Sequence, residues 1–205
     1  MDGGVNIYAR SSDGPIRQGE MISALREIHL SLESEFSESN PRIIFRDHPF
    51  AIVLSQDCDL DQDFSTRNEQ GTTREISALN NLLSGIIFCE VVKASDLRGA
   101  GPDMDSKTWK RVKFNKDERY HFLAGVPVSA DLQGEGLPEL ALDFKKYFTI
   151  PADVVYWQVS ILAKRRCFLM PPYAEHLSAR FFSYQSRIGL PLDHHRYAAD
   201  APHAD

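Results

Sequence analysis

The sequence has little cysteine and no excess of positive charge. Its three cysteines, Cys58, Cys89 and Cys167, are an odd number at wide spacing, which excludes a disulfide framework and predicts free thiols in a reducing cytoplasm. The chain carries 23 Lys and Arg against 29 Asp and Glu, a net charge of −6. It therefore offers no chain-wide positive field for phosphate backbones, and any nucleic-acid site must be a local patch.

Long apolar runs are also missing. Stretches such as 49–54 and 85–89 fall well short of the roughly 20 residues that cross a bilayer, so we expect no membrane span and no membrane partner. Residues 1–15 contain Gly and Asp but no apolar block behind a basic segment, which argues against a secretory signal. These absences favour a cytoplasmic location.

Length and composition indicate one folded domain. With 205 residues, 42% of them hydrophobic and 25% charged, the chain can bury a core of its own, and wholesale disorder or a coiled coil is excluded. Both ends lack hydrophobic periodicity. We therefore expect flexible tails over 1–15 and 192–205 around a single domain over 16–191.

Short apolar runs bounded by turn residues dominate the middle of the chain. Their composition predicts strands at 20–32, 42–45, 49–55, 86–92, 120–124, 139–144 and 154–162. For 20–32 the helix propensity of the residues leaves a helix as an alternative. The second and third of these strands would pair across a turn at Asp47-His48-Pro49. The polar segments 56–75 and 93–107 are expected to be long loops, with a short helix over 76–83.

One helix is predicted near the C-terminus. It follows Pro171-Pro172 and stops at Gly189 and Pro191, and its apolar stripe consists of Leu177, Phe181, Tyr184 and Ile188. Such a stripe needs a sheet to cover. The sequence thus predicts a mainly β (α+β) fold, a small barrel or sheet with a C-terminal amphipathic helix packed on it.

An acidic string follows the apolar run that ends at Leu54. It reads Asp57, Cys58, Asp59, Leu60, Asp61, Gln62 and Asp63. A calcium loop starting at Asp57 would need Gly at its sixth position and Glu at its twelfth, where this chain has Gln62 and Asn68. A divalent ion on some of these carboxylates is one interpretation. A solvated acidic loop needs no ion, so we predict no metal and no cofactor.

Cys58 and His121 resemble the components of a nucleophilic dyad, because a thiolate needs a neighbouring base or cation, but their spacing does not show that they meet. The carboxylates around Cys58 disfavour a thiolate there. A zinc site made from these two residues with Cys89 and Cys167 would lack a short ligand pair such as Cys-x-x-Cys. We therefore expect Cys89 and Cys167 to be core thiols.

Basic residues concentrate at 110–119 and 164–166. The first stretch interleaves cations with Trp109, Phe114 and Tyr120, which suits single-stranded nucleic acid because bases stack on rings while phosphates pair with cations. Solvated strand-edge lysines that discourage aggregation explain the same charges. If RNA binds, the candidate residues are Lys110, Arg111, Lys113, Arg119, Lys164 and Arg165.

Several motifs, taken in order over 16–191, resemble the MazF/PemK toxin family. The string Arg17-Gln18-Gly19-Glu20 is similar to the family's opening Arg-x-Gly-Asp/Glu strand, and 48–55 to its Arg-Pro-x-x-x-Val-x-Ser segment. Residues 153–162, followed by Lys164-Arg165-Arg166, resemble its penultimate strand and basic ending. The middle segments are longer than is usual for that family.

The resemblance implies an SH3-like small barrel with long loop insertions and a C-terminal helix, commonly a homodimer. Active members cut single-stranded RNA without a metal and are inhibited by an antitoxin. Their cleavage relies on the arginine of Arg-Pro and on a threonine or serine that ends the next strand, positions at which this chain has His48 and Val92. In a rewired site, His48 would act as acid or base, Arg46 would supply charge, and Ser95 is the nearest downstream hydroxyl.

Three hypotheses follow. The first is a binding or regulatory module of a bacterial toxin–antitoxin, stress or antiphage defence system, without the usual toxin chemistry, whose two long loops contact an antitoxin-like or regulatory protein. The second is a metal-independent endoribonuclease that cuts single-stranded RNA with the rewired site. The third is an unrelated enzyme built on Cys58, Asp59 and His121, with Asp57 and Asp61 in the same candidate loop site.

Overall fold

The computed structural model describes residues 6–31, 42–68, 80–99 and 104–187. The strands are β1 (Tyr8–Arg10), β2 (Glu20–Ser31), β3 (Arg42–Val53), β4 (Gly85–Lys93), β5 (Tyr120–Leu123), β6 (Leu140–Pro151) and β7 (Lys164–Leu169). The helices are α1 (Asp57–Asn68), α3 (Ala94–Gly99), α4 (Ser106–Lys113), α5 (Ala152–Ile161) and α6 (Tyr173–Gln185), and the short 3-10 helix η1 is Val128–Ala130.

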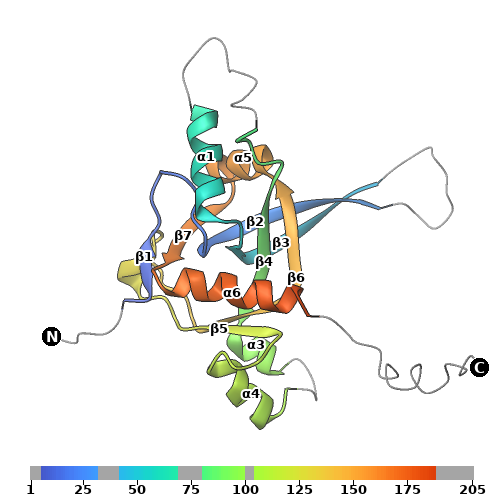
Figure 1. Cartoon of the computed structure of the whole chain (residues 1–205), viewed down its shortest axis with the longest axis vertical. Coiled ribbons are helices and arrows are strands. Elements are labelled where there is room, and N and C mark those ends of the chain that lie inside the picture. The colour runs from blue at the N-terminus through green and yellow to red at the C-terminus, as the bar shows by residue number, and fades with distance from the viewer. Residues whose placement is uncertain (1–5, 32–41, 69–79, 100–103, 188–205) are drawn as a thin grey trace, which may run out of the picture.

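All seven strands form one antiparallel sheet in the order β1-β7-β2-β3-β4-β6-β5 (Figure 1). Within the described residues, the edge strands β1 and β5 share no backbone hydrogen bonds, so the sheet is not a hydrogen-bonded closed barrel. The edges still approach each other, because the Tyr8 hydroxyl donates to the Ala124 carbonyl at 2.6 Å. The prediction of a mainly β fold is confirmed.

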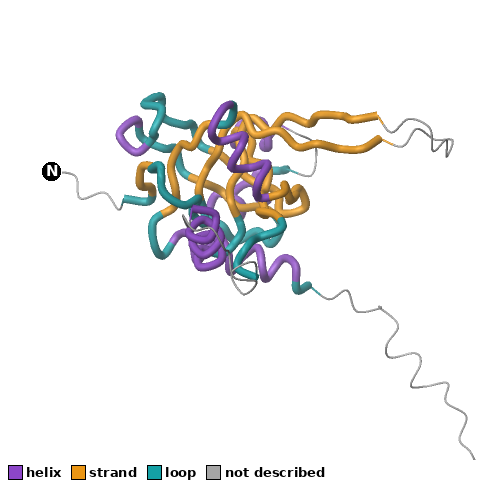
Figure 2. Tube along the Cα trace, turned by 90° about the horizontal axis from the view of Figure 1, so that it is seen from above, coloured by secondary structure: helices purple, strands orange, loops and turns teal. Residues whose placement is uncertain are grey.

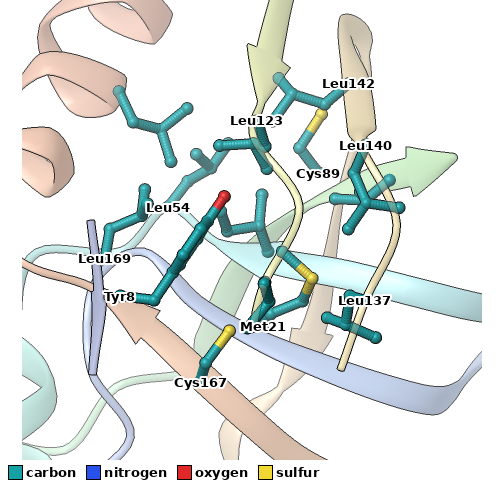
Figure 3. Close-up of a cluster of buried hydrophobic side chains, with 14 of the residues drawn as sticks. Tyr8, Met21, Leu54, Cys89, Leu123, Leu137, Leu140, Leu142, Cys167 and Leu169 are labelled. Atoms are coloured by element: carbon teal, nitrogen blue, oxygen red, sulfur yellow. The ribbon is translucent and has the colours of Figure 1, made fainter. Parts of the chain in front are cut away.

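Different helices close different parts of the core. The largest apolar cluster (Figure 3) packs against α6, whose Leu177 is fully buried. A second cluster includes Leu60 of α1 and Val155 of α5. A third, smaller cluster joins Trp109 of α4 to Ala141 of β6. The helices outside the C-terminal one are therefore integral parts of the fold.

Several sequence predictions are confirmed. Strands β2, β4 and β5 coincide with predicted strands to within one residue at each end, and the prediction over 139–144 covers the first half of β6. Helix α6 lies where its apolar stripe placed it, although Ile188 and the stop residues fall outside the described residues. Cys58, Cys89 and Cys167 are free thiols, and the last two are buried. Burial raises the pKa of Cys167 to about 12.

The predicted strand over 154–162 is wrong, because these residues belong to α5. β-branched and aromatic residues favour a strand only where a sheet accommodates them. Here the buried positions Ala152, Val155 and Gln158 recur every three residues, the spacing of one helix face. Pro151 precedes the first turn and Asp153 lies in it, both typical of a helix start. Residues 164–166 consequently begin β7 instead of ending a strand.

The predicted pair of strands 42–45 and 49–55 is also wrong, because β3 is a single strand. Its register with β2 continues unshifted on both sides of Pro49. Proline has no N–H for the ladder, and in the facing part of β2, Ala24 adopts a positive φ of 58°. The segment Asp47-His48-Pro49, for which the sequence predicts a turn, therefore continues as strand and is paired with β2.

The predicted long loops contain helices. Helix α1 occupies most of the described part of 56–75, while α3 lies within 93–107 and α4 begins there. Asp57 and Asp59 stand in the first turn of α1, where a carboxylate is favoured by the helix dipole. Asp105 caps α4 by accepting from the Thr108 amide at 2.7 Å. Asp57, Asp59 and Asp105, which lie in segments predicted to be loops, therefore mark helix starts.

Three further predictions concern the chain ends and the 76–83 segment. Residues 8–10, assigned to the N-terminal tail, pair with β7 as β1. Residues 80–83 are not helical, and 76–79, like the tail segments 1–5 and 192–205, lie outside the described residues. None of the described helices combines the length and apolar character that a bilayer crossing requires.

Candidate functional site

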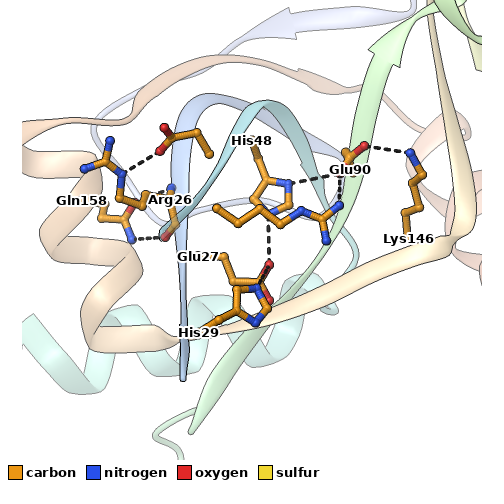
Figure 4. A network of polar contacts seen from close by, with 9 residues as sticks. Arg26, Glu27, His29, His48, Glu90, Lys146 and Gln158 are labelled. Atoms are coloured by element: carbon orange, nitrogen blue, oxygen red, sulfur yellow. Dashed lines mark hydrogen bonds and ion pairs between the residues drawn. The ribbon is translucent and has the colours of Figure 1, made fainter. Parts of the chain in front are cut away.

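A network of charged side chains spans four neighbouring strands (Figure 4). β2 supplies Glu27 and His29, and β3 supplies His48 together with Arg46. Glu90 comes from β4 and its ion-pair partner Lys146 from β6. The register of β2 and β3 places Glu27 directly opposite Arg46, so strand pairing brings the network together.

His48 is the buried centre of this network, with 1% of its side chain exposed. Its Nε2 lies 3.1 Å from Oε2 of Glu27 and its Nδ1 lies 3.5 Å from Oε2 of Glu90. The ring stacks on Phe148 with 3.9 Å between centroids. A neutral imidazole can donate from one nitrogen only. Only the doubly protonated ring therefore presents a proton to both carboxylates.

Glu90 collects the positive charges around His48. It accepts hydrogen bonds from Arg46 Nη2 at 2.8 Å and from Lys146 Nζ at 3.1 Å. Burial acts to raise the pKa of Glu90, but the hydrogen bond and charge of Lys146, with the charges of Arg46 and His48, lower it overall. Both nearby cations are thus already paired with a carboxylate.

The network gathers histidines and carboxylates but offers little free positive charge. Glu27 binds His29 as well as His48, with its Oε2 2.9 Å from His29 Nε2. Half-exposed His29 and Arg46 connect the buried part to solvent. Acid–base chemistry is available here, whereas a phosphate would have to displace Glu90 from its two cations.

The structure brings together two of the three residues of the predicted ribonuclease site. Arg46 and His48 share Glu90 as a partner. Ser95 lies exposed on α3, and its hydroxyl donates to its neighbour Asp96 at 3.2 Å. Among the described residues, Ser95 has no contact with the network, so it does not join His48 and Arg46.

The predicted RNA-binding cations are mostly engaged by carboxylates. Arg165 is buried against Glu20, and Arg119 holds Asp143 through two hydrogen bonds. Arg111 pairs with Asp117 at 3.7 Å and Lys113 with Glu139 at 3.6 Å, while Lys110 and Lys164 are exposed. Trp109 is 8% exposed and packs edge-on to Phe122, so its ring is not offered for base stacking.

The acidic string is a helix with two structural carboxylates. Asp57 pairs with Arg17 at 2.6 Å and accepts from the Gln18 amide. Asp63 is fully buried and accepts hydrogen bonds from Arg67 Nε and from the backbone N–H of Leu83. Asp59 and Asp61 are exposed. Within the described ranges, no group of three or more His, Cys, Asp or Glu has an arrangement that could hold a metal ion.

Cys58 and His121 have separate surroundings. The Cys58 thiol is exposed on α1 and lies 3.5 Å from an oxygen of Asp59. The His121 ring on β5 is buried and faces Phe144 and His176. Burial, with the charges of Arg180 and His176, lowers the pKa of His121 to about 3. No recorded contact of the described residues joins the two side chains.

From the network outward, β2 and β3 continue as a two-stranded arm, which we define as residues 27–31 and 42–46 (Figure 2). The base of the arm includes Glu27, His29 and Arg46 of the network. β2 pairs with β7 only over 20–23, and β3 pairs with β4 only over 50–53. Ile28 stands opposite Phe45 on one face of the ribbon, and Ile43 follows on the same face. These three side chains are 53%, 56% and 57% exposed.

Sequence reasoning missed the arm's apolar face and the partners Glu27, Glu90 and Lys146. The motif that pointed to His48 carries no information on which carboxylates the strand register brings to it.

Comparison of the chain with protein-family models, curated protein sequences and solved structures gives no match.

Proposed function

We propose that this chain is a MazF/PemK-like barrel protein that works as a binding or regulatory module in a bacterial toxin–antitoxin, stress or antiphage defence system, without the usual toxin chemistry. Its partner is another protein, antitoxin-like or regulatory, and the arm is the contact surface. The curved sheet, whose edges meet at Tyr8 and Ala124, supports an SH3-like barrel. The homodimer implied by the family resemblance belongs to the same proposal.

The observation that carries the proposal is the burial of His48 between two carboxylates. A group that takes the proton of a 2′-hydroxyl must reach that hydroxyl, and His48 is covered by Phe148 and Glu27. The positive charge that would stabilise a phosphorane is bound to Glu90. These features fit a structural network better than an RNA-cleaving site.

The arm supplies a surface for a partner. Exposed Ile28, Ile43 and Phe45 lie together on one face of a two-stranded ribbon, a structure that is marginal in water without further packing. Its outer backbone edges have few sheet partners, and such edges accept an added strand from another chain. Apolar contact and strand addition would then act together.

We expect the double variant Ile43→Ser, Phe45→Ser to lose partner binding by at least about tenfold, because central apolar anchors dominate interface energies. Wild type and variant are used as tagged baits in a lysate of the source organism, and the retained protein is purified and titrated against each. Phe114→Ser, which changes an equally exposed ring on the turn after α4, is the matched control. Equal affinity of all three proteins would contradict the role of the arm.

A metal-independent endoribonuclease is the second candidate, favoured by the acid–base groups gathered at His48 and Glu27. If it is correct, the purified protein cleaves a mixed single-stranded RNA pool equally with and without EDTA, and His48→Ala lowers the rate by about 100-fold or more. His29→Gln, which changes the half-exposed histidine of the network, should retain most of the activity. An intact RNA pool at high protein concentration rejects this candidate.

A further inference from the structure

A cavity of about 370 Å³ lies between the start of α1, the start of β4 and helix α6. We call it the α1–α6 groove. Its apolar lining includes Leu54 and Phe181, and its polar lining includes Gln56, Asp59 and Gln185. The volume falls within the range of pockets that take small ligands or single side chains. None of the lining residues belongs to the arm or to the His48 network.

Phe182 gives the groove an open aromatic surface. It lines the groove, and its exposed fraction of 74% is the highest among the large apolar side chains of the described residues. Its neighbour Phe181, by contrast, packs against Phe144 and Tyr147. An exposed ring face attracts a cation through its quadrupole and stacks well with a planar one.

Asp59 gives the groove a negative charge that no cation in the described part of the chain neutralises. Asp57 and Asp63 on the same helix pair with Arg17 and Arg67. Asp59 is exposed, its recorded polar contact is the Cys58 thiol at 3.5 Å, and no cation of the described residues forms an ion pair with it. A carboxylate beside an open aromatic ring is complementary to a cationic ligand.

We propose that the α1–α6 groove binds an arginine side chain of a partner polypeptide, with the guanidinium paired to Asp59 and stacked on Phe182. The side-chain carbonyls of Gln56 and Gln185 accept further N–H groups. The planar guanidinium offers five donors in a fixed fork, whereas an ammonium is a compact, strongly hydrated charge. The mixture of one carboxylate, two amides and a ring therefore fits arginine better than lysine.

The test uses the full chain and three peptides: acetyl-Ala-Arg-Ala-amide, its citrulline counterpart, which has the same shape without the charge, and its lysine counterpart. Binding is measured by NMR titration at low salt. We expect the arginine peptide to bind and the citrulline peptide to bind about fivefold or more weakly, and Asp59→Asn and Phe182→Ala each to weaken the arginine peptide by about fivefold. The lysine peptide is expected to bind more weakly than the arginine peptide.

Two matched controls separate the groove from general attraction to an acidic protein. Asp61→Asn removes the same charge from the same helix outside the groove lining, and Phe114→Ala removes an exposed ring elsewhere. Both should leave the affinity unchanged. Equal weakening by Asp61→Asn, equal binding of the citrulline peptide, or no binding at millimolar peptide would overturn the proposal. Because the groove and the arm share no residue, each result stands apart from the arm experiment.

Discussion

Replacing Arg165 by methionine is expected to lower the free energy of unfolding by about 3–5 kcal/mol, because it leaves a buried carboxylate without its counter-charge. Arg165 donates from Nε and Nη2 to the two oxygens of Glu20, at 2.6 and 2.8 Å. The Glu20 side chain has no exposed surface. The same guanidinium also donates to the carbonyls of Gly14 and Pro15, so it fixes the N-terminal segment on β7.

Urea unfolding at neutral pH measures this effect. Lys164→Met is the matched control, since it removes the exposed cation next to Arg165 and should change stability by less than about 0.5 kcal/mol. The double variant Arg165→Met, Glu20→Met removes both charges and should recover a large part of the loss. A cost below about 1 kcal/mol for Arg165→Met would show that Glu20 finds another partner or becomes protonated cheaply.

This pair also illustrates what a basic triplet in the sequence does not show, namely which carboxylates face its cations. Arg165 stands in a basic triplet beside Lys164 and Arg166, and basic triplets are typical of phosphate contacts. In the structure, Arg166 donates two hydrogen bonds to the carboxylate of Asp131. These hydrogen bonds are the main reason why the pKa of Asp131 is lowered to about 2. The carboxylates that neutralise these arginines come from distant parts of the chain, and only the fold brings them close.

The elements that the sequence predicts well are those with a single strong signal. β4 and α6 have apolar runs or stripes that match one period, and both lie where predicted. The composition of Val154, Val155, Tyr156 and Trp157 favours a strand, whereas the packing of the first three in the second core cluster belongs to helix α5. The side chain of Gln158 in α5 accepts a hydrogen bond from the backbone N–H of Arg26 at 2.8 Å and donates one to the Arg26 carbonyl at 2.7 Å.

In the candidate site, too, the sequence identifies residues within one strand but not their partners on neighbouring strands. His48 and Arg46 are identified from a motif within one strand. Glu27 meets them because β2 and β3 share one register over ten residue pairs, and Glu90 meets them because β4 lies on the other side of β3. A shift of one residue would turn Glu27 to the opposite face, so register decides whether His48 is a surface base or a buried ion-pair centre.

Replacing His121 by leucine is expected to remove a large part of the acid sensitivity of the fold. Burial and two nearby cationic groups lower the pKa of His121 from 6.5 to about 3. The unfolded chain therefore binds a proton below pH 6.5 that the folded chain does not, and the free energy of unfolding falls as pH falls, by about 2 kcal/mol at pH 5. Above pH 6.5 this contribution vanishes.

The measurement is urea unfolding of wild type and His121→Leu at pH 7 and pH 5. Nδ1 of His121 is buried and has no hydrogen-bond partner among the described residues. An apolar side chain of similar size therefore loses no hydrogen bond at that atom, and the variant should match wild type at pH 7 within about 1 kcal/mol. It should lose about 2 kcal/mol less than wild type between pH 7 and pH 5. His176→Gln, which changes the exposed histidine facing the same ring, should keep most of the wild-type loss, since burial is the main cause of the low His121 pKa. The same pH dependence in wild type and His121→Leu would mean that the buried ring takes up a proton in the folded protein.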